Sequence, residues 1–205
     1  EHTQGTGYQL PEYPFETPPE LQGQPSPLYP VVVVGGGITG LTLACALAVH
    51  GVPVVMVDED NTVGVKGASS RGICYTQKSL EILDRLGVFE PIARKGIEWH
   101  VGRTFAGHDE VFSFDLKQQN GFALSQQPSF INIQQFYIEG YLVERLMALK
   151  QAGAPVDLRW SSRVVACQPS AQHVGLRVQT PEGSYELKAQ WVVDASGSHT
   201  PFHEW

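Results

Sequence analysis

Three glycines and one carboxylate carry the clearest chemical signal in the sequence. The glycines are Gly35, Gly37 and Gly40, in the pattern G-x-G-x-x-G, and Asp58 follows 18 residues after the last of them. Glycines at this spacing allow a tight turn, a close approach of the backbone to a pyrophosphate, and close packing of the next helix on its strand. The N–H groups at the start of that helix bind phosphate oxygens, and a carboxylate accepts hydrogen bonds from a ribose 2′-hydroxyl.

The elements around these residues are the ones that a nucleotide site needs. Val31 to Val34 predict a buried parallel strand, and Val54 to Val57 predict a second one. Between them, the apolar run from Leu41 to Val49 predicts a helix that ends at Gly51. This order of elements favours a dinucleotide site over a glycine-rich turn without a ligand: a strand, the glycines, a helix, a second strand and an acidic residue. Because a carboxylate repels a 2′-phosphate, the AMP half of FAD or NAD is favoured over NADP.

Two neighbouring residues belong to the same predicted site. Thr39 lies inside the glycine motif, and we expect it to bind the cofactor. Glu59 follows Asp58, and it takes the ribose if the second strand ends one residue later than expected. In that case Asp58 is a solvated neighbour.

The composition narrows the class of protein. The chain has 205 residues, a net charge of −7 and a pI of about 5.4, with 42% hydrophobic and 17% charged residues. This fits a globular protein, and no basic run predicts binding to nucleic acid or to an anionic membrane. The apolar stretches are too short to span a bilayer. The three cysteines are far apart in the sequence, which favours a reducing cytoplasm, and no His or Cys spacing predicts a metal site.

The remaining pattern predicts a parallel sheet interrupted by other elements. Residues 1–30 carry seven prolines and no Lys or Arg, and they predict an extended arm on the surface or a disordered one, with Tyr13 among the aromatic residues that could pin it to the body. Thr76 is expected to cap a helix over 77–86. The other expected elements are helices over 89–95 and 135–151, strands over 97–105, 111–114, 130–133 and 157–160, an antiparallel meander over 163–167, 174–178 and 185–189, and a separate buried strand over 191–194.

Three segments of this pattern resemble a known family, the FAD-dependent aromatic-ring hydroxylases of the para-hydroxybenzoate hydroxylase superfamily. The segments read VVVVGGGITGL…VVMVDED, SSRGICYTQKSLEILDRLGV and INIQQFYIEGYLVERL, and the likeness extends from about Val31 to His203. The branch that contains 3-(3-hydroxyphenyl)propionate hydroxylase and pentachlorophenol monooxygenase is the most similar. The chain begins with Glu rather than Met, and we expect it to be a trimmed or fragmentary product, the N-terminal part of such a protein.

The resemblance implies a fold and domain limits. The expected class is α/β, a Rossmann-like FAD-binding domain of the glutathione-reductase type with a parallel sheet, an inserted antiparallel β-meander and an incomplete substrate domain. The proline-rich arm covers 1–30 and the FAD-binding domain covers 31–205, with the beginning of the substrate domain inserted at about 97–133.

The resemblance also assigns roles to individual residues. The three glycines of the motif lie under the FAD pyrophosphate, and Asp58 binds the adenosine ribose. Arg71 lies on the phosphate side of the flavin and is implicated in handling NAD(P)H, although alone it could be a solvated surface arginine. Gln135 reaches the pyrophosphate and ribityl chain, or else only caps its own helix. Val164 passes the adenine by its backbone, and Gly197 belongs to the second flavin motif.

Two departures from the family pattern bear on activity. The family's second flavin motif usually reads A-D-G-A-R/N-S, whereas this chain has Ser196 in place of the Asp and His199 in place of the Arg or Asn. That Asp ties the FAD and nicotinamide regions together, so the serine puts reduction by NAD(P)H in question. The chain also stops before the family's G-D-A-A-H segment.

The function implied is an FAD-dependent monooxygenase that hydroxylates a phenolic or other aromatic substrate with NADH or NADPH and O₂. No catalytic acid or base is assigned. The alternatives are another flavin-dependent oxidoreductase such as an oxidase or halogenase, and a non-catalytic FAD-binding remnant. An NAD-dependent dehydrogenase would leave the segments around Arg71 and Gln135 unexplained. The expected partner is a small aromatic molecule, and a homo-oligomer is compatible with the sequence.

Overall fold

The computed structural model describes residues 10–64, 73–118 and 125–197. Two compact units are present, the first formed by residues 1–69 with 142–205 and the second by 70–141, and each is described by itself. The predicted residues Arg71 and His199 lie outside the described residues. The expected limits of an inserted substrate domain, 97–133, stay a prediction.

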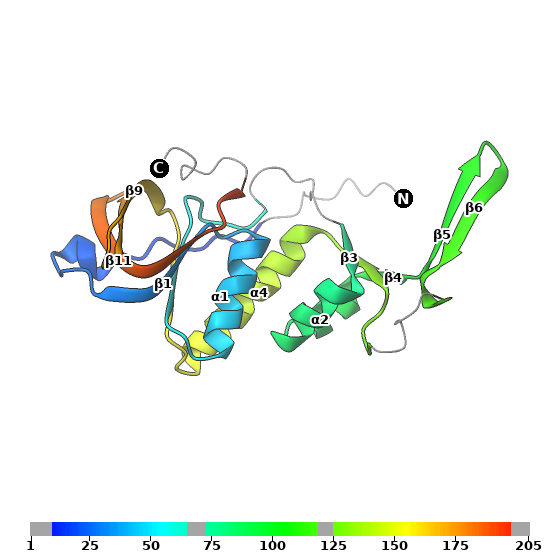
Figure 1. Ribbon diagram of the computed structural model, residues 1–205, viewed down its shortest axis with the longest axis horizontal. Helices are drawn as coiled ribbons and strands as arrows, with labels where there is room; N and C mark the ends of the chain where they lie inside the picture. Colours follow the sequence, from blue (N-terminus) through cyan, green and yellow to red (C-terminus); the bar gives the residue numbers. More distant parts are fainter. Residues whose placement is uncertain (1–9, 65–72, 119–124, 198–205) are drawn as a thin grey trace. The chain divides into compact units, whose positions relative to one another are not determined.

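The first unit is built on a six-stranded sheet (Figure 1). Its order is β8-β2-β1-β11-β10-β9. The first four strands in this order are mutually parallel, and β11, β10 and β9 form an antiparallel meander. The strands are β1 (Leu28–Val34), β2 (Val54–Val57), β8 (Val156–Arg159), β9 (Arg163–Pro169), β10 (Val174–Thr180) and β11 (Gly183–Asp194).

Apolar, mostly β-branched side chains place β1 and β2 in the core, as the sequence predicts. Val32 and Val33 are fully buried, and all four residues of β2 are buried. Helix α1 (Ile38–Val49) packs on both strands and buries the small side chains of Ala44, Cys45 and Ala48. The helix ends before Gly51, whose φ of +70° suits a residue without Cβ. The predicted strand–helix–strand unit is confirmed, with β1 beginning at Leu28 rather than Val31.

One expectation for the end of the chain is wrong. Two strands were expected over 185–189 and 191–194, but β11 is a single strand of 12 residues. It pairs with β10 through its first half and with β1 from Lys188 to Asp194, so the two ladders overlap and no break occurs. Its last part is not buried, since Trp191 is 71% exposed. Pairing with neighbouring strands satisfies the backbone, but only a covering layer buries a side chain.

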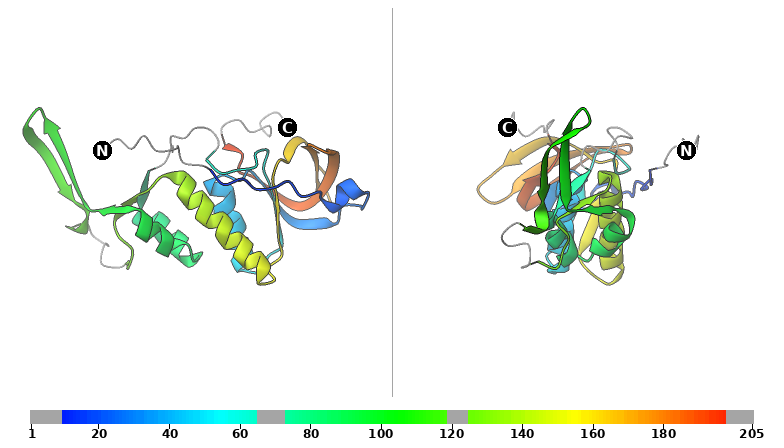
Figure 2. Two further views of the ribbon diagram at one scale, coloured as in Figure 1. Left: turned by 180° about the vertical axis from the view of Figure 1, so that it is seen from behind. Right: turned by 90° about the vertical axis from the view of Figure 1, so that its right-hand side faces the viewer.

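The amino-terminal arm packs on the first unit. The segment contains a short 3-10 helix, η1 (Pro19–Gln22), which contacts β11 (Figure 2). Glu12 forms an isolated antiparallel bridge with Thr62. Among the aromatic residues expected to pin the arm, Tyr13 and Tyr29 make defined contacts with the body, which are described below.

The second unit contains a three-stranded antiparallel sheet in the order β3-β7-β4 and two helices. The strands are β3 (Cys74–Thr76), β7 (Phe130–Asn132) and β4 (Ile97–Trp99), and the helices are α2 (Gln77–Arg85) and α3 (Phe89–Lys95). The predicted apolar face of α2 is confirmed, because Leu80, Leu83 and Leu86 are all buried. Thr76 does stand at the N-cap position, but its side chain makes no capping hydrogen bond; its hydroxyl lies 3.4 Å from that of Ser79 instead.

A two-stranded hairpin extends from this unit, formed by β5 (Val101–Ala106) and β6 (Asp109–Asp115) (Figure 1). The single strand expected over 97–105 is therefore divided at His100, whose ring lies 2.9 Å from Asp115. β4 pairs with β7, whereas β5 pairs with β6, so the two pieces belong to different sheets. A short 3-10 helix, η2 (Leu116–Gln118), follows the hairpin.

Helix α4 (Gln135–Gln151) matches its predicted limits. Ile138, Leu142 and Leu146 are fully buried, as the predicted apolar spacing requires. None of the helices that the structure describes combines the length and the apolar character needed to cross a bilayer.

Candidate cofactor site

Two of the three motif glycines are required by the packing of the backbone itself. Gly35 has a φ of +109°, and its N–H donates to the carbonyl of Val57 at 2.8 Å. A Cβ at Gly35 would overlap the carbonyl of Ala195, and a Cβ at Gly40 would overlap the carbonyl of Gly35. These glycines therefore bring the ends of β1, α1 and β11 together, whether or not a ligand is bound.

Gly37 differs from these two because nothing in the packing requires it. It stands at the N-cap of α1 with a φ of −78° and a ψ of −179°, a conformation open to any residue. A Cβ there would meet no described atom within 4 Å. The missing side chain leaves the amino-terminal end of α1 accessible, and this end attracts anions through its amide groups and the helix dipole. An open helix end of this kind is suited to a phosphate group.

The Asp58 carboxylate lies beside the glycine loop. The residue directly follows β2, and its Oδ2 accepts a hydrogen bond from the N–H of Gly36. Its Oδ1 accepts one from the N–H of Asp60 at 2.9 Å. Glu59, in contrast, is half exposed and pairs with the exposed Arg163 at 3.5 Å. The geometry thus favours Asp58 over Glu59 as the acceptor for a ribose.

Burial raises the pKa of the Asp58 carboxyl to about 6, from its ordinary value of 3.8. The hydrogen bonds from Gly36 and Asp60 act in the opposite direction, and the charges of Asp60 and Glu59 add to the rise. Desolvation disfavours the charged form, which explains the direction. At pH 7.5 the carboxylate is ionised, but this pH is less than two units above its pKa.

The loop after β8 also contacts Asp58, and the sequence analysis missed it. The Ser162 N–H donates to the Asp58 carbonyl at 2.7 Å, and the Ser161 N–H donates to the Asp60 carbonyl at 2.9 Å. Trp160 is 5% exposed, and its ring lies close behind Gly36. The sequence offers only a tryptophan and two serines after a strand, and nothing in that pattern points to the second loop.

The residues at the end of β11 lie next to the glycine loop. The Ala195 N–H donates to the Val34 carbonyl at 2.7 Å. The Ser196 hydroxyl donates to Asp194 Oδ1 at 2.6 Å, and the Ser196 N–H donates to the same oxygen at 3.0 Å. Gly197 follows with a φ of +85°. The second flavin motif therefore begins next to the first, although its binding role stays a prediction.

Two further candidates lie at other positions of the first unit. Thr39 is exposed in the first turn of α1, where its side chain is accessible to a ligand. Val164 is 5% exposed in β9, and its side chain belongs to the core cluster beneath the sheet. The backbone contact that the resemblance implies for Val164 stays a prediction.

Gln135 lies at the start of α4, in the second unit. Its side-chain Nε2 donates to Glu139 Oε1 at 2.7 Å, and Glu139 is only 3% exposed. This bond fixes the orientation of the amide along the helix. The predicted cofactor contacts of Gln135 and Arg71 stay predictions.

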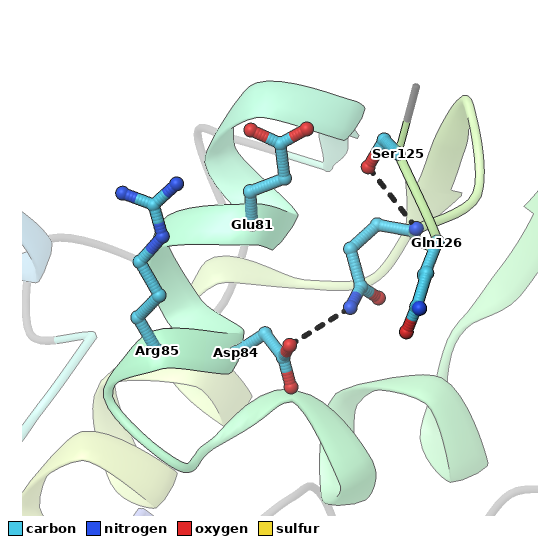
Figure 3. Close-up of a pocket in the computed structure, with 6 residues that line it drawn as sticks. Glu81, Asp84, Arg85, Ser125 and Gln126 are labelled. Carbon is cyan, nitrogen blue, oxygen red and sulfur yellow. Dashed lines mark hydrogen bonds between the residues drawn. The ribbon is translucent and has the colours of Figure 1, made fainter. Parts of the chain in front are cut away.

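The second unit also contains a polar cavity of about 350 Å³ (Figure 3). Glu81, Asp84 and Arg85 of α2 line one side, and Ser125 to Gln127 line the other. The Gln127 side chain donates to Asp84 Oδ2 at 2.9 Å, and its backbone N–H donates to the Ser125 hydroxyl. None of the predicted cofactor residues that the structure describes lines this cavity.

Comparison with known proteins defines the family. Residues 28–204 match the model of the FAD binding domain family, so the chain belongs to this family. It is 25% identical over 173 residues to para-nitrophenol 4-monooxygenase from Pseudomonas sp. strain WBC-3, with 83% of this chain and 40% of that protein covered. It is 27% identical over 175 residues to 6-hydroxy-3-succinoylpyridine 3-monooxygenase from Pseudomonas putida, with 83% and 41% covered.

Solved structures agree with these relatives. The crystal structure of p-nitrophenol 4-monooxygenase from Pseudomonas putida DLL-E4 is similar with a TM-score of 0.75 and 25% identity, covering 87% of this chain and 43% of that one. The expected fold class and the resemblance to flavin-dependent aromatic monooxygenases are confirmed. The chain spans about two fifths of the length of these two curated relatives.

Proposed function

We propose that this chain binds FAD at the glycine loop and belongs to an FAD-dependent monooxygenase that hydroxylates an aromatic substrate with NADH or NADPH and O₂. Family membership supports the cofactor, and the relatives named above are monooxygenases. The observation that carries the proposal is the open amino-terminal end of α1 next to the Asp58 carboxylate, since a phosphate cradle beside a sugar acceptor is what a dinucleotide requires.

In this proposal the residues of the chain bind and orient the cofactor. The amide groups at Gly37 and the first turn of α1 bind the pyrophosphate, and Asp58 accepts hydrogen bonds from the ribose of the adenosine half. Each Asp58 oxygen already accepts one backbone N–H, which holds the carboxylate in place and leaves further lone pairs for sugar hydroxyls. FAD, when bound, supplies the redox chemistry that transfers an oxygen atom from O₂.

An FAD titration tests the cofactor, with two glycine-to-alanine variants as a matched pair. Gly37→Ala and Gly140→Ala both place a methyl group where no described atom lies within 4 Å. Only Gly37 stands at the proposed phosphate mouth, so we expect Gly37→Ala to weaken FAD binding at least tenfold and Gly140→Ala to leave it unchanged. Both should keep the circular dichroism spectrum of the wild type. Equal FAD affinity in the two variants would show that FAD does not bind at Gly37.

Reduction of bound FAD tests the enzyme class. NADH or NADPH should bleach the flavin absorbance, and a phenol with O₂ should then give a hydroxylated product. Ser196, where the family usually has Asp, is the feature that favours a second candidate, a non-catalytic FAD-binding protein. Tight FAD binding without bleaching would support that candidate, whereas turnover without hydroxylation would support an oxidase or halogenase.

A cytoplasmic location is also part of the proposal. Cys45, Cys74 and Cys167 are free thiols, and Cys74 is exposed. Unpaired cysteines of this kind suit a reducing compartment.

A further inference from the structure

The amino-terminal arm contacts two loops next to Asp58, the loop after β2 and the loop after β8. The Tyr13 N–H donates to the Asn61 carbonyl at 2.7 Å, beside the bridge between Glu12 and Thr62. The Tyr13 ring stacks on Trp160, with the ring centroids 4.5 Å apart and 18° between the planes. The arm thus covers both the loop after β2 and the loop after β8.

Trp160 connects this stack to the glycine loop. A Cβ at Gly36 would lie 3.1 Å from Trp160 Cζ3 and 3.1 Å from Asp58 Oδ2, so the indole, the carboxylate and Gly36 are closely packed. The Gly36 N–H is the donor to Asp58. The buried indole therefore packs directly against the residue whose amide bonds the carboxylate.

The arm is anchored at the residue that precedes Trp160. Arg159 Nη1 lies 3.0 Å from Glu20 Oε2, and both side chains are 3% exposed. Tyr29 donates to Glu20 at 2.7 Å and accepts from Arg159 at 3.0 Å. The end of β8 therefore carries both the buried ion pair that holds the arm and the indole that the arm covers.

We propose that the arm is part of the nucleotide site, with Tyr13 as a positioning residue that acts through Trp160 on the adenosine end of the dinucleotide. The inference rests on the proposed function, since it requires a nucleotide at the glycine loop. Hydrogen bonds to sugar hydroxyls depend on direction, so a carboxylate held in place binds better than one that moves. Loss of a stacked aromatic pair should then weaken binding about three- to tenfold.

Binding of three ligands by four proteins tests this role. The proteins are the wild-type 205-residue chain, Tyr13→Ala, Tyr13→Phe and Thr17→Ala, and the ligands are FAD, ADP and inorganic pyrophosphate. Thr17 is the control within the arm, because its hydroxyl bonds the exposed Glu182 at 2.7 Å, away from Trp160. We expect Tyr13→Ala to weaken FAD and ADP binding about three- to tenfold and to leave pyrophosphate binding unchanged. Tyr13→Phe and Thr17→Ala should bind all three ligands like the wild type.

The ligand pattern separates positioning from a general loss of structure. A purely structural role would weaken pyrophosphate binding together with ADP binding. That result, or unchanged or tighter ADP binding by Tyr13→Ala, overturns the inference while leaving the proposed function intact. A wild-type chain that binds neither FAD nor ADP overturns both. If Tyr13→Ala is unfolded at the assay temperature, Tyr13→Leu replaces it, with the same expected pattern, since it covers Trp160 without stacking.

Discussion

Adjacent carboxylates after β2 have different environments, and we therefore expect them to differ in their chemistry. Asp58 is bonded to two backbone amides and packed among the loops, whereas Glu59 is half exposed and paired with a surface arginine. Burial raises the pKa of the Asp58 carboxyl, whereas the Glu59 side chain stays in contact with water. One residue of displacement in the strand would exchange the two roles.

The raised pKa of Asp58 predicts that FAD binding weakens as the pH falls through about 6. Sugar hydroxyls donate to the ionised carboxylate, so binding favours the charged form. At pH 5.5 roughly a quarter of the groups remain ionised, so the dissociation constant should rise about fourfold relative to pH 7.5. Fluorescence titration of FAD across this range measures it, and Asp58→Asn should give weaker binding with no pH dependence.

The unliganded protein should show the opposite dependence. A carboxyl whose pKa is raised in the folded state stabilises the fold fully below the unfolded value of 3.8, and this contribution is lost as the pH rises through about 6. Urea unfolding of the FAD-free wild type and of Asp58→Asn isolates the effect of this group. A stability difference between the two that does not change between pH 4.5 and 7 would contradict the assignment.

Ser161 predicts a substitution that stabilises the protein. Its φ of +51° lies in the left-handed region, which a residue with a Cβ adopts at a cost. Ser161→Gly should raise the free energy of unfolding by about 0.5–1 kcal/mol in urea titrations. The neighbouring Ser162→Gly is the control, since this buried side chain bonds the Trp160 carbonyl at 3.1 Å and its loss should destabilise. Two variants with the same sign would refute the interpretation.

At the scale of elements, the buried ion pair between η1 and β8 joins the arm to the sheet. Among the described residues, Glu20→Gln leaves the buried Arg159 with the half-exposed Asp157 as its remaining ion-pair partner. Removing one member of a buried pair costs about 3 kcal/mol in the free energy of unfolding. Glu186→Gln is the matched control, because its pair with Arg177 is exposed on both sides and should contribute less than about 1 kcal/mol. Equal losses in urea unfolding would show that burial does not decide the outcome.

Elements with local signals could be predicted from the sequence, whereas those set by distant partners could not. The limits of β2, α3 and α4 follow from apolar spacing and capping glycines, and they match. The break at His100 depends on the pairing of β4 with β7 and of β5 with β6, and the continuity of β11 depends on its pairing with β1. The residues near these positions do not indicate either pairing. The glycine motif and Asp58 could be found for the same reason as α4, since their spacing is local. The contribution of Trp160 and the arm required tertiary packing.

At the scale of the whole molecule, the β5–β6 hairpin predicts self-association. Among the described residues these strands pair only with each other, and Phe105, Val111 and Phe112 are each more than half exposed. Exposed apolar clusters and open strand edges promote association. Replacing both Val111 and Phe112 with Ser should shift the chain toward monomer in sedimentation velocity. Arg103→Gln on the neighbouring strand should not, and an unchanged distribution for the double variant would exclude the hairpin as the contact.

Trp191 is exposed to water on β11, at a position where the strand pairs with Val31 of β1. An indole exposed to water emits at long wavelength. A polypeptide segment or a separate molecule that covers Trp191 would shift its emission to shorter wavelength. The difference in emission between the wild type and a Trp191→Phe variant, which keeps the other three tryptophans, would therefore report on whatever covers this part of β11.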